Sequence, residues 1–284
     1  MDLSQGDLRD RPSLERAAQG CQVLFHVAAD YSFWVPDVKA MYQTNVDGTR
    51  NILEVALRAG MSRAVYTSTV ATVGLPGDGR PGTEELQPRP KDLYGHYKQS
   101  KYMAERAAFE VQRLGLPLVV VNPATPIGVG DLKPTPSGKI IVDYLNHRMP
   151  AYVNTGLNFI DVEDVAKGHV LALEKGRVGE RYILGNRNLT LKEVFQILEG
   201  ITDIKAPKVK IPIGLALVVA YVDEFVSSKL RGKPPRVPLT GVKMSRKPMY
   251  YSAAKAVAEL GLPQSPIESA FEKAVRWYHD QGYA

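Results

Sequence analysis

Apolar and polar positions alternate along the first half of the chain in two recurring patterns. Short runs rich in Val and other strand-forming residues predict buried strands over 22–28, 62–69 and 117–123. Longer segments in which apolar residues return every three or four positions predict helices over 37–59 and 94–114. The order strand, helix, strand, helix, strand therefore predicts an α/β protein.

Val-rich strands separated by helices are typical of a parallel sheet covered on both faces, which is the doubly wound arrangement. Ligands on such sheets bind beyond the carboxyl ends of the strands. Three segments fall there: Ala28-Ala29, Thr67-Ser68-Thr69 and Asn122-Pro123. After about residue 130 the pattern loosens, with loops expected at 131–138 and 150–158. We expect a smaller region there that faces the substrate and is interleaved with the last strands.

Composition narrows the class of protein. The 284 residues are 44% hydrophobic and 23% charged, which is ordinary for a globular chain with a substantial core. The one cysteine, Cys21, excludes an internal disulfide and is expected to be a small core residue in a reducing compartment. No cluster of metal-ligating side chains is evident, so we expect no metal site. With no signal peptide recognised, the expected location is the cytoplasm.

The net charge of +6 is unevenly distributed. Residues 201–250 contain ten Lys or Arg against three Asp or Glu. Such a cluster can face a phosphorylated substrate, an anionic membrane surface or nucleic acid, or can simply be solvated. Aromatic residues are not interleaved with it, which disfavours nucleic acid. The apolar run 211–222 is too short for the ~20 residues of a spanning helix, but its basic flanks motivate peripheral contact with a membrane.

Candidate chemistry lies in the second predicted helix. Tyr97 and Lys101 are four residues apart and therefore share a helix face, where the ammonium can favour the tyrosinate. Spacing alone is weak evidence, because Tyr94 and Lys98 fit the same pattern. The hydroxyl cluster Thr67-Ser68-Thr69 closes the preceding strand, and a hydroxyl there can donate to a carbonyl oxygen while a tyrosine moves the proton. Hydroxyl, phenol and ammonium together suit carbonyl or alcohol chemistry with an external hydride carrier.

The sequence resembles the extended short-chain dehydrogenases/reductases of the NAD-dependent epimerase/dehydratase family. Within this family it is most similar to hopanoid-associated sugar epimerases and dihydroflavonol 4-reductases. The similarity runs through nearly the whole chain, and its motifs follow the order of the family. The matching stretches are GDLRD (6–10), LFHVAADYSFW (24–34), NVDGTRNIL (45–53), VYTSTVATVG (65–74), GHYKQSKYMAE (95–105), VVVNPATPIG (119–128), KPTPSGKIIVD (133–143), FIDVEDVAKGH (159–169) and ERYILGNRNLT (180–190).

The resemblance implies a Rossmann-type fold, NAD or NADP as cofactor, and roles for particular residues. Tyr97 becomes the general acid/base, Lys101 lowers its pKa and binds the nicotinamide ribose, and Thr69 is the catalytic hydroxyl. Asn45 would fix the catalytic helix, and His26 has no catalytic role. The remaining implied cofactor contacts are Asp7, Leu8, Ala28, Ala29, Thr67, Ser68, Asn122 and Pro123. Asp30, Tyr31, Lys133 and Arg181 are guesses at substrate contacts.

One departure from the family concerns the phosphate-binding turn. Family members open with a strand, a glycine-rich turn and a helix that holds the pyrophosphate. Nothing upstream of Gly6 matches these, so we expect the first strand-helix units to be missing, through a misplaced start codon or in a genuine remnant. Their loss is expected to separate the third and fourth strands of the family and to expose two apolar sheet edges. GDGRPG at 77–82 fits G-x-G-x-x-G, but it opens no predicted helix and is taken as a coincidence.

Two functions remain open. The first is an NAD(P)-dependent epimerase/dehydratase or carbonyl reductase acting on a nucleotide-sugar or an isoprenoid- or hopanoid-linked substrate. The second is a non-catalytic nucleotide-sensing or scaffold protein on a decayed reductase fold. Residues 1–130 are expected to form the truncated dinucleotide-binding domain, and 131–284 most of the substrate-binding region. The expected partners are a small-molecule substrate, a possible homodimer by resemblance and a membrane surface, without nucleic acid.

Overall fold

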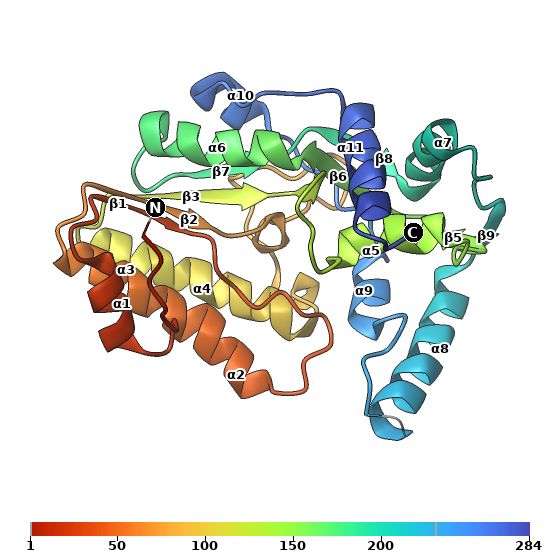
Figure 1. The fold of residues 1–284 in the computed structure, drawn as a ribbon, viewed down its shortest axis with the longest axis horizontal. Helices are drawn as coiled ribbons and strands as arrows, with labels where there is room; N and C mark the ends of the chain where they lie inside the picture. Colours follow the sequence, from red (N-terminus) through yellow and green to blue (C-terminus); the bar gives the residue numbers. More distant parts are fainter. Residues whose placement is uncertain (1, 231) are drawn as a thin grey trace.

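The central element is a sheet of four parallel strands. A computed structural model describes residues 2–230 and 232–284 of the chain. The strands lie in the order β1-β2-β3-β7, so three strands in sequence order are followed by one from much later in the chain (Figure 1). Their bounds are β1 Val23–His26, β2 Arg63–Thr67, β3 Leu118–Pro123 and β7 Arg181–Leu184.

Helices cover both faces of this sheet, as the sequence predicts. On one face lie α1, α3 and α4, and on the other α6 and α10 (Figure 1). All six residues of β3 are buried between the two layers, which accounts for its continuous apolar sequence. The helices span α1 Arg11–Ala18, α3 Gly48–Arg58, α4 Gly95–Arg113, α6 Val162–Lys175 and α10 Ala254–Leu260.

The predicted helix over 37–59 is present but interrupted. It consists of α2 (Val38–Tyr42), a π-helical turn over Gln43–Asp47, and α3. Gly48, where α3 begins, lies against Leu8, and an added Cβ there would come within 2.7 Å of the Leu8 Cβ. Because π turns widen a helix by one residue, this one rotates the residues on either side of it. The buried residue in the turn is Asn45.

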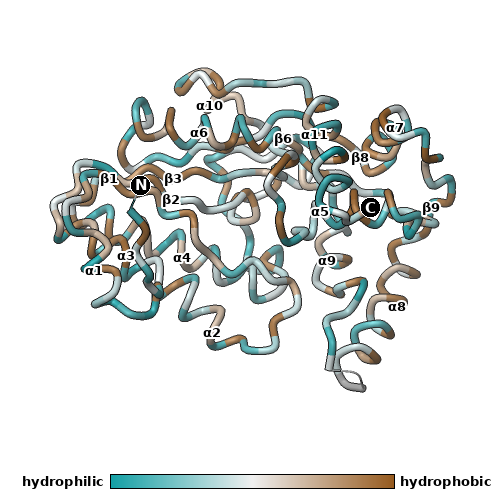
Figure 2. Tube along the Cα trace, in the orientation of Figure 1, coloured by the Kyte–Doolittle hydropathy of each residue, from teal (hydrophilic) through white to brown (hydrophobic). Residues whose placement is uncertain are grey.

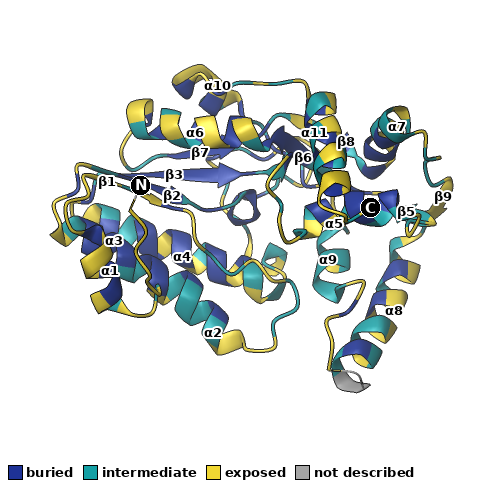
Figure 3. Ribbon diagram, in the orientation of Figure 1, coloured by how far each residue is buried: buried dark blue, intermediate teal, exposed yellow. Residues whose placement is uncertain are grey.

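The outer strand β1 departs from the predictions. It bonds directly to β2, so the expected separation of the family's third and fourth strands is wrong for the described residues. The sequence predicts a buried strand here, but β1 is partly exposed, because only one of its edges and one of its faces are covered. Val23 and Phe25 are each 39% exposed and Val27 is 61% exposed. They lie at a single exposed apolar sheet edge, where the sequence predicts two such edges. Cys21 is also exposed and not part of the core. By contrast, β3 is buried along its length (Figure 3).

Beyond residue 130 the chain is more regular than predicted. Residues 131–135 are irregular, as expected, but α5 begins at Pro136 with Thr135 as its cap. Most of the loop expected at 150–158 is instead formed by β5 and the start of β6. The strands form sheets of order β4-β6-β8 and β5-β9. The elements are β4 Thr125–Ile127, α5 Pro136–Leu145, β5 Ala151–Val153, β6 Gly156–Asp161, β8 Arg187–Thr190, α7 Leu191–Thr202, β9 Val209–Ile211 and α11 Ile267–Asp280. Strand β7 returns to the first sheet, and α6 packs against that sheet.

The basic region 201–250 contains a helix whose apolar residues are largely exposed. Helix α8 (Ile213–Glu224) extends from the body of the protein and is followed by a π-helical turn (Phe225–Leu230) and α9 (Leu239–Met244) (Figures 1 and 2). Of the basic residues counted in the sequence, Arg231 and the side chain of Lys229 lie outside what is described. Within the described ranges, none of the helices has the length and apolar character needed to cross a membrane.

Candidate active site

The predicted lysine is buried at the carboxyl end of β2. Lys101 is 3% exposed, and its Nζ donates to the Tyr66 hydroxyl at 3.1 Å and to the Thr67 carbonyl at 2.9 Å. The same ammonium lies 4.8 Å from the centre of the Tyr66 ring. Burial lowers the pKa of Lys101 to about 8, while the Glu105 carboxylate acts in the opposite direction. Strand and helix are thus joined at the point where the family resemblance places the chemistry.

Tyr97 lies one helical turn before Lys101 and is partly buried. Its ring is 5.8 Å from that of Phe33, which comes from the loop after β1. Burial raises the pKa of Tyr97, and a hydrogen bond with Thr69 acts against this rise. The prediction that Lys101 lowers this pKa is not borne out in the isolated chain. The ammonium is directed to Tyr66 and Thr67, so at neutral pH Tyr97 keeps its proton.

Thr69 is held in place by a side chain from the neighbouring strand. It caps the short 3₁₀ helix Val70–Thr72, where its Oγ1 accepts from the Ala71 N–H at 3.2 Å. The Asn122 Nδ2 donates to the Thr69 carbonyl at 3.0 Å and to Glu105 Oε2 at 2.8 Å. Asn122 is fully buried, so its side chain positions Thr69 and does not face a cofactor as the resemblance implied. Pro123, the next residue, is buried as well.

Behind Asn122 lies a buried ion pair. The Arg181 Nη1 is 2.9 Å from Glu105 Oε1, and the two side chains are 7% and 6% exposed. The Arg181 guanidinium also donates to the Glu84 and Leu86 carbonyls, at 2.7 and 3.0 Å. With its donors used inside the protein, Arg181 is not a substrate contact, and the guess from the sequence is wrong.

Asn45 connects the loop after β1 to the helix that carries Tyr97. Its Nδ2 donates to the Asp30 carbonyl at 2.8 Å and to Ser100 Oγ at 3.0 Å, and its Oδ1 accepts from the Asp30 N–H at 2.8 Å. Ser100 in turn donates to the Tyr97 carbonyl at 2.9 Å. The predicted role of Asn45 in fixing the catalytic helix is confirmed as a contact.

Histidine and tyrosine side chains from adjacent strands support the lysine. His26 is 3% exposed, lies 3.0 Å from Thr49 Oγ1 and stacks on Tyr66 at 5.2 Å between ring centres. Burial, with Lys101 nearby, lowers the pKa of His26 to about 3, so the ring is neutral and part of the core as predicted. Tyr66 was not predicted. Its only signal was its place directly before the Thr67-Ser68-Thr69 cluster, where tyrosine also suits a strand.

The other residues implied by the resemblance are spread along the same end of the sheet. Ala28 is exposed and Ala29 partly exposed at the end of β1, while Ser68 is buried and the Thr67 hydroxyl lies 2.8 Å from His169 Nε2. The remaining residues are more peripheral. Asp7 is exposed and paired with Arg9 at 2.6 Å, Leu8 packs into the core, Tyr31 is 45% exposed, and Lys133 is exposed.

The residues present fit the nicotinamide-ribose half of a dinucleotide. Lys101 has three N–H groups, and two are used by described residues, which leaves one for a ribose hydroxyl. The phosphate half has no comparable support. The G-x-G-x-x-G match at 77–82 lies in a loop that leads to no helix, as predicted. Across residues 2–230 and 232–284 no group of His, Cys, Asp and Glu side chains could hold a metal ion.

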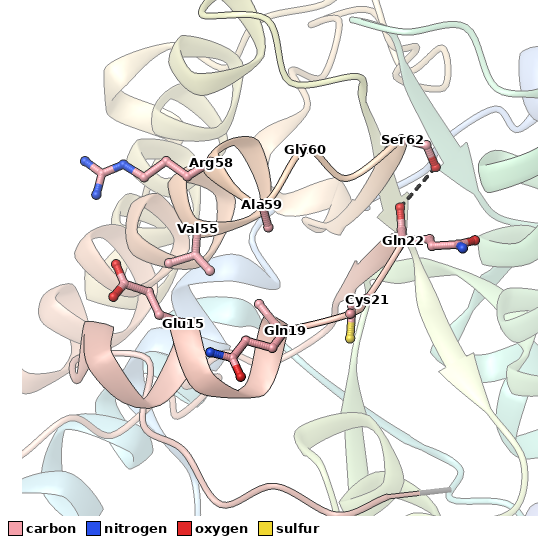
Figure 4. A pocket seen from close by; sticks show the side chains of 11 residues that line it. Glu15, Gln19, Cys21, Gln22, Val55, Arg58, Ala59, Gly60 and Ser62 are labelled. Carbon is pink, nitrogen blue, oxygen red and sulfur yellow. Dashed lines mark hydrogen bonds between the residues drawn. The ribbon is translucent and has the colours of Figure 1, made fainter.

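A cavity of about 650 Å³ lies at the opposite end of the sheet (Figure 4). It is bounded by the ends of α1 and α3 and by the residues that lead into β1 and β2, among them Gln19, Cys21 and Ser62. Because Tyr97 and Thr69 lie beyond the carboxyl ends of the strands, this cavity is remote from the candidate chemistry. Its size alone does not make it a substrate site.

Comparison with known proteins identifies the family. Residues 2–185 match the family model described as the NAD dependent epimerase/dehydratase family. The chain belongs to this family. A Synechocystis protein provisionally named a dihydroflavonol 4-reductase is 52% identical over 287 residues, which cover 100% of this chain and 83% of that protein. Sterol demethylase protein B of Methylococcus capsulatus is 30% identical, with 99% and 86% covered.

Solved structures agree on the fold. The crystal structure of gox2253 superposes with a TM-score of 0.87 at 43% identity, over 99% of this chain and 86% of that one. UDP-glucose 4-epimerase of Thermotoga maritima, solved with UDP-glucose, has a TM-score of 0.76 at 21% identity, with 97% and 83% covered. The Rossmann-type architecture is therefore established, and the second comparison speaks to fold alone.

Removal of one partner from the buried ion pair should be far more costly than removal of one from an exposed pair. Arg181→Leu leaves the Glu105 carboxylate buried without its cation, and we expect the free energy of unfolding to fall by about 3–5 kcal/mol. Arg187→Leu is the matched control, because its pair with Glu268 is 51% and 48% exposed, and it should cost less than about 1 kcal/mol. Urea unfolding of both variants measures the difference. Equal losses would contradict the role given to Arg181.

Proposed function

We propose that the chain is an NAD(P)-dependent enzyme in which Tyr97 donates a proton to the oxygen of a substrate carbonyl. The observation that carries the proposal is the convergence of Thr69, Tyr97 and Lys101 at the carboxyl ends of β2 and β3. The cofactor, when bound, supplies or accepts a hydride. Thr69 orients the substrate oxygen, and Lys101 holds the ribose against the end of β2 with its remaining N–H.

Tyr97 can serve the reductive direction. Burial raises its pKa, so Tyr97 carries a proton at neutral pH and can act as a general acid toward a carbonyl oxygen. A tyrosine is protonated at neutral pH even at its ordinary pKa, so this state does not by itself select a direction. We prefer a carbonyl reductase, with the ketone-reducing half of an epimerase or dehydratase as the other possibility. The resemblance to dihydroflavonol 4-reductases supports the preference.

We propose two alternative substrate classes. A nucleotide-linked sugar or an isoprenoid- or hopanoid-linked ketone is consistent with a basic region beside the site. Residues from that region reach the loop over Tyr97: Trp34 Nε1 donates to Ser228 Oγ at 2.9 Å, and Phe33 lies beside Gly241. Ser228 and Gly241 thus bring parts of the basic region against the loop that carries Phe33 and Trp34. A homodimer through α4 and the helix before it stays a prediction from resemblance.

Replacement of the tyrosine separates the enzyme from a nucleotide-sensing or scaffold protein. Tyr97→Phe removes the proton donor and little else, so we expect NAD(P)H-dependent reduction of a carbonyl panel to fall by about 10²–10⁴-fold while the Kd for the cofactor stays unchanged. Tyr102→Phe on the same helix is the control and should retain activity. Absorbance of the nicotinamide and fluorescence quenching measure the two quantities. A Tyr97→Phe variant with full turnover would overturn the proposal.

We also propose that α8 lies on an anionic membrane surface. Exposed apolar side chains of α8 recur at helical spacing: Leu215 is 52% exposed, Val218 60%, Val219 50% and Val222 59%, and Phe225 in the turn that follows is 58% exposed. This stripe is the kind of apolar face that enters the boundary between lipid headgroups and chains.

The charges around α8 match such a surface. Lys208 and Lys210 precede the helix and Lys233 and Arg236 follow it, and all four are exposed. The two acids at its end are turned toward the protein. Asp223 accepts from the Val237 N–H at 2.8 Å and Glu224 from the Leu239 N–H at 2.9 Å. The helix thus presents apolar and positively charged groups outward, which complements anionic lipid.

Vesicle sedimentation tests this surface. The wild-type chain should sediment with vesicles that contain phosphatidylglycerol at low salt, but not with pure phosphatidylcholine. Val218→Asp combined with Val222→Asp should abolish binding, because both charges would enter the apolar boundary. Val178→Asp, at a 48% exposed valine outside this helix, is the control and should bind normally. Binding that survives the double substitution would refute the proposal.

A further inference from the structure

A second cavity lies on the side of α4 where the helix begins. Its volume is about 270 Å³, and its wall is formed by the segment after β2, the residues before α4 and the end of α9. The family match does not assign a role to this cavity. Its charged lining residues are Arg89, Asp92, Lys98, Lys243, Arg246 and Lys247.

The cavity has a large excess of positive charge. Five of the six charged lining residues are cations, and the one acid, Asp92, is already engaged by Arg89 at 2.6 Å and lies 3.7 Å from Lys247. Lys243 and Arg246 form no ion pair with any described residue. Helix α4 adds to this field, because its N-terminus begins at Tyr94 in the cavity wall and has no side-chain cap.

Lys98 is the unusual member of this group. It is only 7% exposed, yet its Nζ makes no hydrogen bond or ion pair with the described residues. Its stem is packed in the protein while the ammonium keeps access to the cavity, because Lys98 Nζ is not among the fully enclosed polar atoms that lack a partner. An ammonium in such a largely desolvated position without a protein acceptor is available to an anion. Consistently, burial lowers the pKa of Lys98 to about 8, and Asp92 offsets this only in part. An anion in the cavity would supply the missing acceptor.

The cavity is adjacent to the candidate active site. Lys98 directly follows Tyr97 in α4, and Ala71 in the cavity wall donates its N–H to Thr69 Oγ1 at 3.2 Å. A substrate whose carbonyl lies at Tyr97 and Thr69 could extend around the start of α4 into this space. We propose that the cavity binds a phosphate-type anionic group of the substrate, with Lys98 as its innermost contact. The assignment of that anion to a substrate rests on the proposed function.

Binding of inorganic pyrophosphate tests the site without any turnover. Calorimetry at neutral pH and constant ionic strength should give a Kd that Lys98→Met weakens by about 10–100-fold, the effect of one charge-assisted hydrogen bond. Lys98→Arg should bind within a few-fold of the wild type. The control is Lys91→Met, at an exposed lysine of the same segment that does not line the cavity, and it should bind normally.

Folding is not expected to confound this test. Because Lys98 is buried without a partner, Lys98→Met should keep or raise the Tm of the protein. An equal loss of pyrophosphate binding in Lys98→Met and Lys91→Met would mean a diffuse basic surface and would overturn the proposal. Binding that is unchanged in Lys98→Met would overturn it as well.

A second measurement distinguishes a group on the substrate from a free anion. In steady-state reduction, pyrophosphate should compete with the carbonyl substrate in the wild type, and Lys98→Met should raise KM far more than it lowers kcat. Non-competitive inhibition would contradict the assignment to substrate. If the chain had no turnover, the proposed function would fail while the calorimetric test of the anion site still stood.

Discussion

The site depends on the placement of one buried ammonium. Lys101 bonds to the Tyr66 hydroxyl and the Thr67 carbonyl and so ties α4 to the end of β2. A charge buried to this extent needs acceptors, and the strand end supplies two of them. His26 packs against Tyr66 from the outer strand, so β1, β2 and α4 meet at the lysine. Once Lys101 is fixed, the helix geometry places Tyr97 one turn earlier, beside Thr69.

A second polar network holds Thr69 from the other side. Asn122 binds the Thr69 carbonyl and the Glu105 carboxylate, and Glu105 pairs with Arg181 from β7. A buried network of this kind is favourable only when nearly every member is satisfied. One atom is not, because Asn122 Oδ1 has no partner among the described residues. The unsatisfied atom thus belongs to the side chain that holds Thr69, whose hydroxyl we propose orients the substrate oxygen.

Much of the fold was predictable from local patterns. The helix predicted over 94–114 is α4, Gly95–Arg113, and the strand predicted over 117–123 is β3, because both carry strong periodic signals. The burial of β1 was not predictable, since its sequence is apolar whether or not a neighbour covers it. The order of the strands likewise depends on pairing between distant segments.

The candidate site was likewise predictable only in part. Tyr97, Lys101 and Thr69 were recognisable from spacing and family order, but the acceptors of Lys101 were not, since Tyr66 lies 35 positions away from it in the chain. Arg181 was misassigned for the same reason, as its partner Glu105 is 76 residues earlier. The pKa of Tyr97 follows from these tertiary contacts: with the ammonium engaged elsewhere, burial dominates and the proton stays.

We propose that Tyr97 is a protonated donor in the protein without cofactor and not a preformed tyrosinate. Carbon-13 NMR of protein labelled at the tyrosine Cζ tests it most directly, with the Tyr97 signal assigned by its absence in Tyr97→Phe. In the protein without cofactor, Tyr97 should remain protonated at pH 7 and titrate above its ordinary value of 10.0. A Tyr97 signal that titrates near pH 7 would contradict the account.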